Sequence, residues 1–510
     1  MSAAFTNTFW TLVPSITAIV LALIIREPHV SLFIGAFFAA LLVAGLQPVT
    51  AIHMFITDGV MTAISENAGI ITFVVILGVI INILNMTNGS AAFGRWSAKH
   101  IKTQTGAMFA TFVLGILIFI DDMFNCFTVA TVMMPVTDRN KMSRQKLAYL
   151  LDATAAPICM IAPISSWGAA VSSTAEGLGT GMKGIQLFIK AIPFNFYSLL
   201  TLIFIIVIGI MKFDYGKMRK YQEEALKGDL GEAKNNDKTT KDNALEGKII
   251  DLIIPIGVMM VVCTTSMMYI GGFFDAASEN FHSIAGSFAN TDGAVALSIG
   301  GIVTLVFTVI YSMLRKTMNL KNVTDCIFGS FKIAGSPLVI LILAVSLKNL
   351  TLTMGIREYI SMVMQNTASG LYRMLPAVIF IIACFVAFAS GTSWGTFGIL
   401  IPIVTAIFPV DSTLLIIGIS ACLAGAVCGD HCSPISDTTI MSSAAAQCEH
   451  VTHVETQLPY VITVAAISFV TYIVAGFVQN AVICLIVGVV LVVATLTVIR
   501  KVEQSRVINN

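Results

Sequence analysis

The sequence predicts an all-α polytopic membrane protein, built as an inverted repeat with two re-entrant hairpins, two broken transmembrane helices and about 11 spans. The first observation is composition: 56% of the 510 residues are hydrophobic and only 11% are charged, against about 25% in soluble domains. The second is an apolar stretch, residues 106–135, with two adjacent acids at its middle. The third is a similar pattern in the second half of the chain. A soluble globular fold is therefore excluded.

Three apolar segments open the chain, at about 9–25, 30–46 and 68–86. The first has no basic residue before it and no small-residue cleavage site after it. We therefore expect a retained span and not a signal peptide.

The stretch 106–135 is the segment around which the chain is organised. Two crossings of a bilayer need about 40 residues, because one helical span takes about 20. A single straight span would place Asp121 and Asp122 in hydrocarbon, at a cost of about 2.5–3.5 kcal/mol each. We therefore predict a re-entrant hairpin, with its polar tip at 121–128 lining a wet or protein-enclosed site.

The chain then continues with a proline-broken segment at 147–175, a span at 188–211 and a polar stretch at 212–248. The polar stretch is typical of a solvated linker. It separates two predicted repeats, 1–211 and 249–479, and the last span and C-terminal tail occupy 480–510. Apolar segments of the second part are 249–270, 294–314, 327–350, a hairpin at 374–409, a broken segment at 412–443, 460–478 and 480–499.

The basic residues indicate how the chain is oriented. Lys and Arg concentrate in every second connection and are absent from 47–67 and 271–293. Since cytoplasmic loops carry the excess of Lys and Arg, we expect an external N-terminus, a cytoplasmic linker and a cytoplasmic C-terminus.

Two stretches of similar pattern then lie in opposite orientations. Residues 121–135 and 388–402 each run from a polar tip to a proline, and APISSWGAAVSS (162–173) is similar to SPISDTTIMSS (433–443). Chance similarity between apolar segments is the alternative, and the shared Pro-Ile-Ser together with the independent charge argument speaks against it. An inverted repeat of this kind is typical of secondary transporters.

The broken segments supply a candidate cation site. Pro157 and Pro163 interrupt the first, and Gly429 and Pro434 the second, since proline removes a helical hydrogen bond. Unwound backbone and hard oxygen ligands suit unpolarisable ions, and we extend this to sodium. A hydroxyl bonded back to its own helix is the structural alternative for each Ser or Thr. The candidate sodium or substrate-binding residues are Asp121, Asn125, Thr128, Ser165, Ser166, Thr392, Ser393, Thr396, Ser433, Ser436 and Thr438.

Acids inside apolar segments are candidates for proton or cation coupling. Asp437 ranks first because it replaces Ser166 of the other half, Asp430 second and Asp122 third. For Asp152, a structural role and a functional role stay equally open. Trp167 and Trp394 beside the polar runs are interpreted as packing residues, with a gate or a stacking surface for substrate as the alternative.

Ten cysteines are present without a CxxC pair, and most read as small buried hydrophobic residues. Cys428, His431 and Cys432 match no standard zinc spacing. We expect no cofactor and no metal beyond sodium, which acts as the coupling ion.

The sequence resembles the NhaC-type sodium/proton antiporter family of the ion transporter superfamily. The resemblance rests on IDDMFNCFTVATVMMPVTDRNKMSRQKLAYLLDATAAPICMIAPISSWGAAV (120–171), GTSWGTFGILIPIV (391–404) and GDHCSPISDTTIMSS (429–443), followed by CEHVTHVETQLPY (448–460). It implies a homodimer in the bacterial inner membrane, with an elevator-like motion and hairpin tips at 125–128 and 392–396.

Sodium/proton antiport is thus the first functional hypothesis, with sodium, protons and the lipid bilayer as partners and no nucleic acid. The alternative is sodium-coupled transport or exchange of a small organic solute, such as a carboxylate or an amino acid. An intramembrane aspartyl enzyme is disfavoured, because its two acids must lie about 3 Å apart and adjacent helical residues point to different faces. A channel is disfavoured by broken helices around a closed midplane site.

Overall fold

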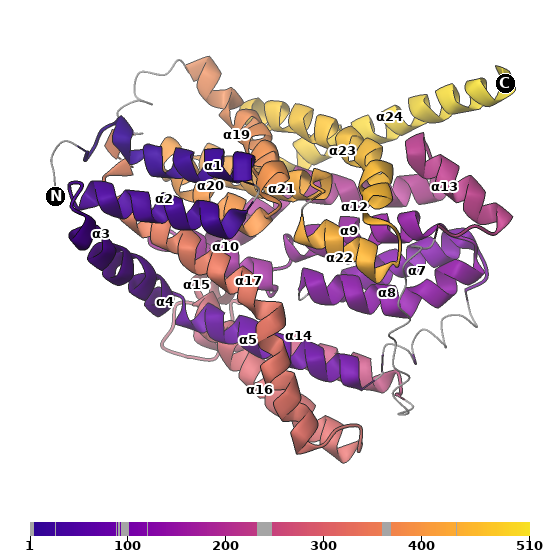
Figure 1. Cartoon of the computed structure of the whole chain (residues 1–510), viewed down its shortest axis with the longest axis horizontal. Helices are drawn as coiled ribbons and strands as arrows, with labels where there is room; N and C mark the ends of the chain where they lie inside the picture. The colour runs from indigo at the N-terminus through magenta and orange to yellow at the C-terminus, as the bar shows by residue number, and fades with distance from the viewer. Residues whose placement is uncertain are drawn as a thin grey trace.

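The computed structural model describes residues 5–509 apart from 26, 88, 90–91, 93–100, 120, 232–246, 357, 360–368 and 435. Every regular element in this part of the chain is a helix (Figure 1), which confirms the predicted all-α fold. Five of the helices are long and apolar enough to cross a membrane, or seven if each of two bent pairs forms one span. The protein is therefore a multi-pass membrane protein.

The first helices are α1 (Val13–Ile25), α2 (Pro28–Val43) and α5 (Ala68–Met86). Residues 47–67, expected only as a connection, are also helical. They form α3 (Pro48–Met54), the π-helical η2 (Phe55–Met61) and α4 (Thr62–Glu66). Pro48 fits at the start of α3, where no helical N–H partner is needed, and the chain bends by 118° between α2 and this segment.

The predicted first hairpin is formed by α7 (Gln104–Leu117) and α8 (Asp122–Arg139). Four residues, 118–121, connect the two helices. The turn thus lies just before the position expected for it, and Asn125 and Thr128 belong to the first two turns of α8.

The first broken segment consists of α9 (Arg144–Cys159) and α10 (Ser166–Ala175). Pro157 was expected to take part in the break, but it lies inside α9, which continues for two residues beyond it. This close to the helix end its missing N–H removes one hydrogen bond, and the helix absorbs that loss. The break itself contains Pro163.

Next come α11 (Gly184–Ala191), the short η3 (Ile192–Phe194) and α12 (Phe196–Met211), with a bend of 44° between the pair and α12. The amphipathic helix α13 (Gly216–Lys227) occupies the beginning of the predicted linker. Residues 232–246 of that linker lie outside the described part.

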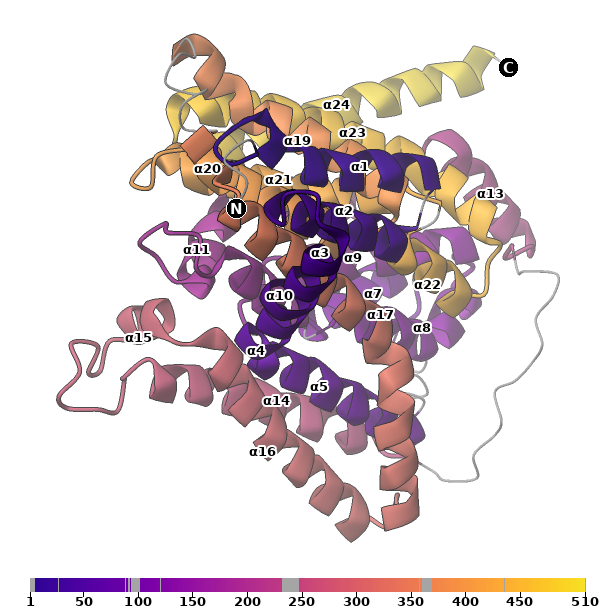
Figure 2. The same ribbon diagram turned by 60° about the vertical axis from the view of Figure 1, so that its left-hand side comes forward.

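The second part of the chain begins with α14 (Ile250–Ile270), α15 (Ile284–Asn290), α16 (Gly293–Leu314) and the long α17 (Leu320–Thr353). In Figure 2, α5, α14 and α16 lie together at one side of the molecule, and α17 runs from this group towards α2 and α20. An ion pair braces the group, because Arg315 Nε donates to Asp251 Oδ1 at 2.9 Å.

The predicted second hairpin is formed by α19 (Ser369–Ser390) and α20 (Ser393–Ile407), and the second broken segment by α21 (Thr413–Cys432) and α22 (Asp437–Ala445). Gly429, expected to interrupt this segment, lies inside α21. The break begins four residues later, at Ser433, and contains Pro434. The last two helices are α23 (His450–Val478) and α24 (Ala481–Asn509).

The hairpins and the broken segments pack crosswise. Helix α10 of the first part contacts α20 of the second hairpin, and α22 of the second part contacts α8 of the first hairpin. Each hairpin also contacts the broken segment that follows it in the chain, α8 with α9 and α20 with α21. The two breaks are therefore held next to each other in the middle of the protein.

Candidate functional site

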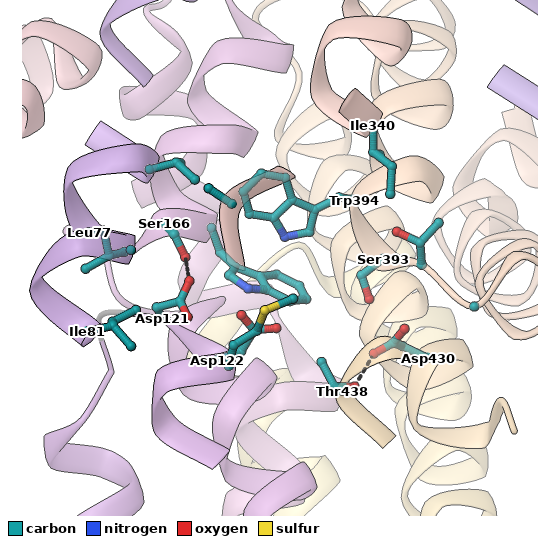
Figure 3. A pocket seen from close by; sticks show the side chains of 17 residues that line it. Leu77, Ile81, Asp121, Asp122, Ser166, Ile340, Ser393, Trp394, Asp430 and Thr438 are labelled. Carbon is teal, nitrogen blue, oxygen red and sulfur yellow. Dashed lines mark hydrogen bonds between the residues drawn. The ribbon is translucent and has the colours of Figure 1, made fainter. Parts of the chain in front are cut away.

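A small cavity lies where the two breaks meet (Figure 3). It offers about 50 Å³ to the centres of water-sized molecules, which is room for a few waters or a partly hydrated ion. Seven helices or their ends contribute to it. The polar and aromatic lining residues are Asp121, Asp122, Ser166, Trp167, Thr392, Ser393, Trp394, Asp430 and Thr438.

On the side of the first hairpin, two carboxyl groups face the cavity. Asp121 Oδ2 accepts a hydrogen bond from Ser166 Oγ at 3.0 Å, which joins the hairpin turn to the first residue of α10. Asp122 is the first residue of α8 and is only 8% exposed. Acids at the start of a helix interact favourably with its N–H groups, which favours an acid at this position.

On the side of the second broken segment, Asp430 stands near the end of α21. Its Oδ2 accepts a hydrogen bond from Thr438 Oγ1 at 2.6 Å. Thr438 Oγ1 also lies 3.0 Å from Ser436 Oγ, and Ser436 in turn caps α22 by accepting from the Thr439 N–H at 3.3 Å. A single hydroxyl therefore connects the buried acid to the first turn of α22.

The charge of the cavity is one-sided. Three carboxyl groups line it, and no Lys, Arg or His occurs among the described residues of its lining. Buried charges require a partner of opposite sign or neutralisation. The site is therefore suited to a cation, to protons or to an exchange of the two.

Several predicted oxygen donors lie outside the lining and have local bonds instead. Asn125 Nδ2 donates to the carbonyls of Gly115 (2.7 Å) and Ile118 (2.8 Å), which fixes the hairpin turn. The Oγ1 of Thr396 donates to the Thr392 carbonyl at 2.8 Å, the back-bond expected under its structural interpretation.

The two serines at the breaks cap helices. Ser165 Oγ accepts from the Gly168 N–H at 2.9 Å and donates to the Cys159 carbonyl at 2.6 Å, which spans the first break. Ser436 has the corresponding place before α22. Ser433 is buried in the second break, and Thr128 is buried in α8 with no partner for its Oγ1 among the described residues. The side chain of Asp437 lies outside the described part of the structure.

Trp167 and Trp394 meet at the cavity. Their ring centroids are 6.4 Å apart and nearly perpendicular, and Phe397 packs against both. Since Trp167 belongs to the start of α10 and Trp394 to the start of α20, the pair joins the two halves. Both residues therefore pack against each other and also line the cavity.

The apolar wall of the cavity was not foreseen. It is formed by α5 and α17, through Leu77, Ile81, Ala334 and Ile340. No sequence signal distinguished these residues from other apolar residues of the two helices.

Comparison with known proteins agrees with this arrangement. The model of the Na+/H+ antiporter family matches residues 158–477, which include α10, both elements of the second hairpin and the second broken segment. Fold, cavity and family match make the protein a membrane transporter of the secondary type.

The chain belongs to the Na+/H+ antiporter family, and the resemblance predicted from its motifs is confirmed. An uncharacterized protein of Haemophilus influenzae is 34% identical over 484 residues, covering 93% of this chain and 92% of the relative. The structure is similar to MtrF of Neisseria gonorrhoeae, described among antimetabolite efflux pumps, with 13% identity, a TM-score of 0.40 and coverage of 83% of this chain and 85% of MtrF. It is also similar to the YdaH transporter of Alcanivorax borkumensis, with 14% identity, a TM-score of 0.43 and coverage of 84% and 89%.

Proposed function

We propose that the protein is a sodium/proton antiporter that works by an elevator-like alternating-access mechanism. The observation that carries this proposal is the cavity with three carboxyl groups and no basic residue in its described lining. Such a site binds either a cation or protons, because a bound cation favours the carboxylates and burial favours the protonated groups. Exchange of the two on opposite sides of the membrane is antiport.

We assign the coupling role to the acids that the sequence ranked, Asp437, Asp430 and Asp122. Asp430 and Asp122 line the cavity from its two sides. Hydroxyl groups of Ser166, Ser393 and Thr438 supply hard oxygen atoms beside them, the ligand type that suits an alkali cation.

The alternative cargo is a small organic solute carried together with sodium. The Trp167–Trp394 pair supports it, because both residues line the cavity and aromatic rings are surfaces against which a solute can stack. The charge of the lining favours the ion, since its three carboxyl groups attract a cation and repel the carboxylate of an organic acid.

A second cavity supports alternating access. It offers about 670 Å³, and like the first it is lined by α5, α10 and α17. On α10 it begins at Ser172, six residues from Ser166 of the first cavity, or about 9 Å along the helix. Its lining includes Glu66 and Asp292, from stretches without Lys or Arg, together with Lys183 and Lys348. We infer that it is the external approach to the cation site.

We further propose that 1–211 and 249–479 are inverted repeats, and from the resemblance a homodimer in the bacterial inner membrane. In the two repeats α10 is equivalent to α22, and α8 is equivalent to α20. The contacts α10–α20 and α22–α8 are therefore the same contact made in both directions, which supports the repeat.

Transport by the purified protein in sealed liposomes tests the function. We expect an imposed sodium gradient to drive a pH change detected by an internal dye, without accumulation of labelled carboxylates or amino acids. Solute accumulation under the same gradient with no pH change would replace antiport by sodium-coupled solute transport.

Removal of one hydroxyl from the cavity should weaken sodium binding. In Ser166→Ala, Asp121 loses its hydrogen-bond donor and the ion loses an oxygen ligand. We expect the free energy of sodium binding to become less favourable by about 1–3 kcal/mol, which corresponds to roughly a tenfold rise or more in the half-saturating sodium concentration. Ser198→Ala is the matched control, because Ser198 is equally buried but lies on α12 away from the cavity. An unchanged sodium dependence in Ser166→Ala would remove Ser166 from the site.

Labelling from the two sides of the membrane tests the orientation. Single cysteines replacing Lys227, at the end of α13, and Glu279, before α15, are introduced into a chain without native cysteines. Both positions are exposed. We expect the impermeant reagent to reach Glu279→Cys from outside intact cells and Lys227→Cys only after the membrane is opened. Labelling of both from the same side would contradict the inverted repeat.

A further inference from the structure

A second group of buried ionisable residues lies behind the cation cavity. Asp152 in the middle of α9 and His453 in the first turn of α23 are both fully buried, as is His431 of α21. None of the three lines the cavity. The proposed transport site therefore leaves their chemistry unused.

Asp152 is held by neutral donors. Its Oδ2 accepts from Gln457 Nε2 at 2.9 Å and from Thr439 Oγ1 at 3.1 Å, and His453 Nε2 lies 3.6 Å from the same oxygen. Within the described residues, Asp152 Oδ1 and both ring nitrogens of His453 are buried without a hydrogen-bond partner. The contact between Asp152 and His453 is therefore closed to solvent.

No described Lys or Arg is paired with Asp152. Lys146, two turns earlier on α9, instead makes an ion pair with Asp214 at 2.8 Å. A buried carboxylate without a permanent cation is costly, and one proton on either Asp152 or His453 makes the pair neutral overall. The titratable groups around Asp152 are His431 and Cys432 of α21, His453 of α23, Cys126 of α8 and Tyr149 of α9 itself. Tyr197 of α12 contacts His431 at 3.0 Å.

Adjacent threonines connect this pair to the cavity. Thr438 donates to the side chain of Asp430 in the cavity, and the next residue, Thr439, donates to Asp152. Thr439 Oγ1 also lies 3.3 Å from the Asp430 carbonyl. A shift of the first turn of α22 when a cation engages Asp430 therefore changes the hydrogen bonding of Asp152.

A polar stripe on α23 leads from the pair to the surface. His450, His453 and Gln457 follow one another at spacings of three and four residues, so they lie on one helix face. His450 is partly accessible and its Nε2 contacts the Pro434 carbonyl in the second break. His450 belongs to the connection at 444–459, which the predicted topology places in the cytoplasm although it contains no Lys or Arg.

We propose that Asp152 and His453 form a second proton-binding site, which holds one proton while the cavity lacks a cation and releases it along α23 when a cation binds. The inference rests on the proposed cation transport. It means that one additional proton is released for each cation that binds. Charge balances, because one positive charge enters the cavity region as another leaves the pair. The released proton leaves the pair through His450.

Proton release on sodium binding tests the site directly. Purified protein in a weakly buffered detergent solution is mixed with sodium chloride, and an indicator dye counts the protons released per protein. We expect His453→Gln and Asp152→Asn each to release one proton fewer than wild type. When one proton fewer is released per cation, the apparent sodium affinity changes about tenfold less for each pH unit.

His53→Gln is the matched control, since His53 is exposed on α3 and remote from the cavity, and it should behave as wild type. If Asp152→Asn does not fold, the result for His453→Gln decides. The effect of sodium on the melting temperature, measured at acid and at alkaline pH, reports the same coupling between proton binding and sodium binding without a transport assay. Wild-type proton counts in His453→Gln would overturn the second site. Failure of the proposed function is distinguishable, because wild type itself would then release no protons on addition of sodium.

Discussion

Replacement of Asp430 by asparagine is expected to reduce sodium-driven proton movement to the level of empty liposomes. Asparagine keeps the shape of the side chain and still accepts the bond from Thr438 Oγ1, which is 2.6 Å long in the native protein. Asparagine cannot take up or release a proton, and one of the three carboxyl groups of the cavity is lost. Because Asp430 is 2% exposed, water does not substitute for the missing charge.

The measurement is the pH change in liposomes under a sodium gradient, with the amount of inserted protein determined for each variant. Asp411→Asn is the matched control, because Asp411 is an exposed acid in the connection between α20 and α21. It should transport at the wild-type rate. A wild-type signal from Asp430→Asn, at equal insertion and thermal stability, would assign the coupled proton to another carboxyl group.

The organisation of the transport region was predictable because its physical constraints are visible in the residue pattern. Adjacent acids in an apolar stretch too short for two spans require a turn, and α7 and α8 meet at residues 118–121. Prolines after an interrupted helix then indicate the breaks, which contain Pro163 and Pro434. These constraints depend on chain length and solvation, so they need no knowledge of tertiary contacts.

The roles of single side chains within that region were less predictable. Asn125 and Ser165 satisfy backbone groups at a turn and a helix start, whereas Ser166, one residue further, faces the cavity. Both serines fit an ion site and a helix cap equally well by composition. Only the direction in which each residue leaves its helix separates the two roles, and tertiary packing sets that direction.

Partners distant in the chain were the least predictable. Asp152 meets Thr439 and Gln457 across 287 and 305 residues of sequence, and no pattern in the sequence indicated these partners. Lys146, the nearest basic residue before it on the same helix, pairs with Asp214. Gly429 was likewise assigned to a break by its residue type, whereas it occupies a tight helix–helix contact.

That contact leads to the second large effect expected, from substitution of Gly429. Helices α19 and α21 pack through small residues, Ala383 and Ala387 on one side and Gly425 and Gly429 on the other. A Cβ atom on Gly429 would lie 2.8 Å from the Ala387 Cβ and still closer to the Cys384 carbonyl oxygen. The carbonyl belongs to the backbone of α19, so it cannot rotate away as a side chain would. The helices must separate, as expected for a contact that depends on small residues.

We expect Gly429→Ala to destabilise the protein by about 1–3 kcal/mol through overpacking, and Gly429→Val by more, with a lower melting temperature in detergent. Transport should also fall in the folded fraction, because Asp430 follows Gly429 directly and shifts with the backbone of α21. Gly257→Ala on α14 is the matched control: no atom lies within 4 Å of the added methyl group, and alanine is the better helix former by about 1 kcal/mol. That variant should melt at or above the wild-type temperature. If Gly429→Ala melted like Gly257→Ala and transported normally, the close approach of α19 and α21 would not be required for the position of Asp430.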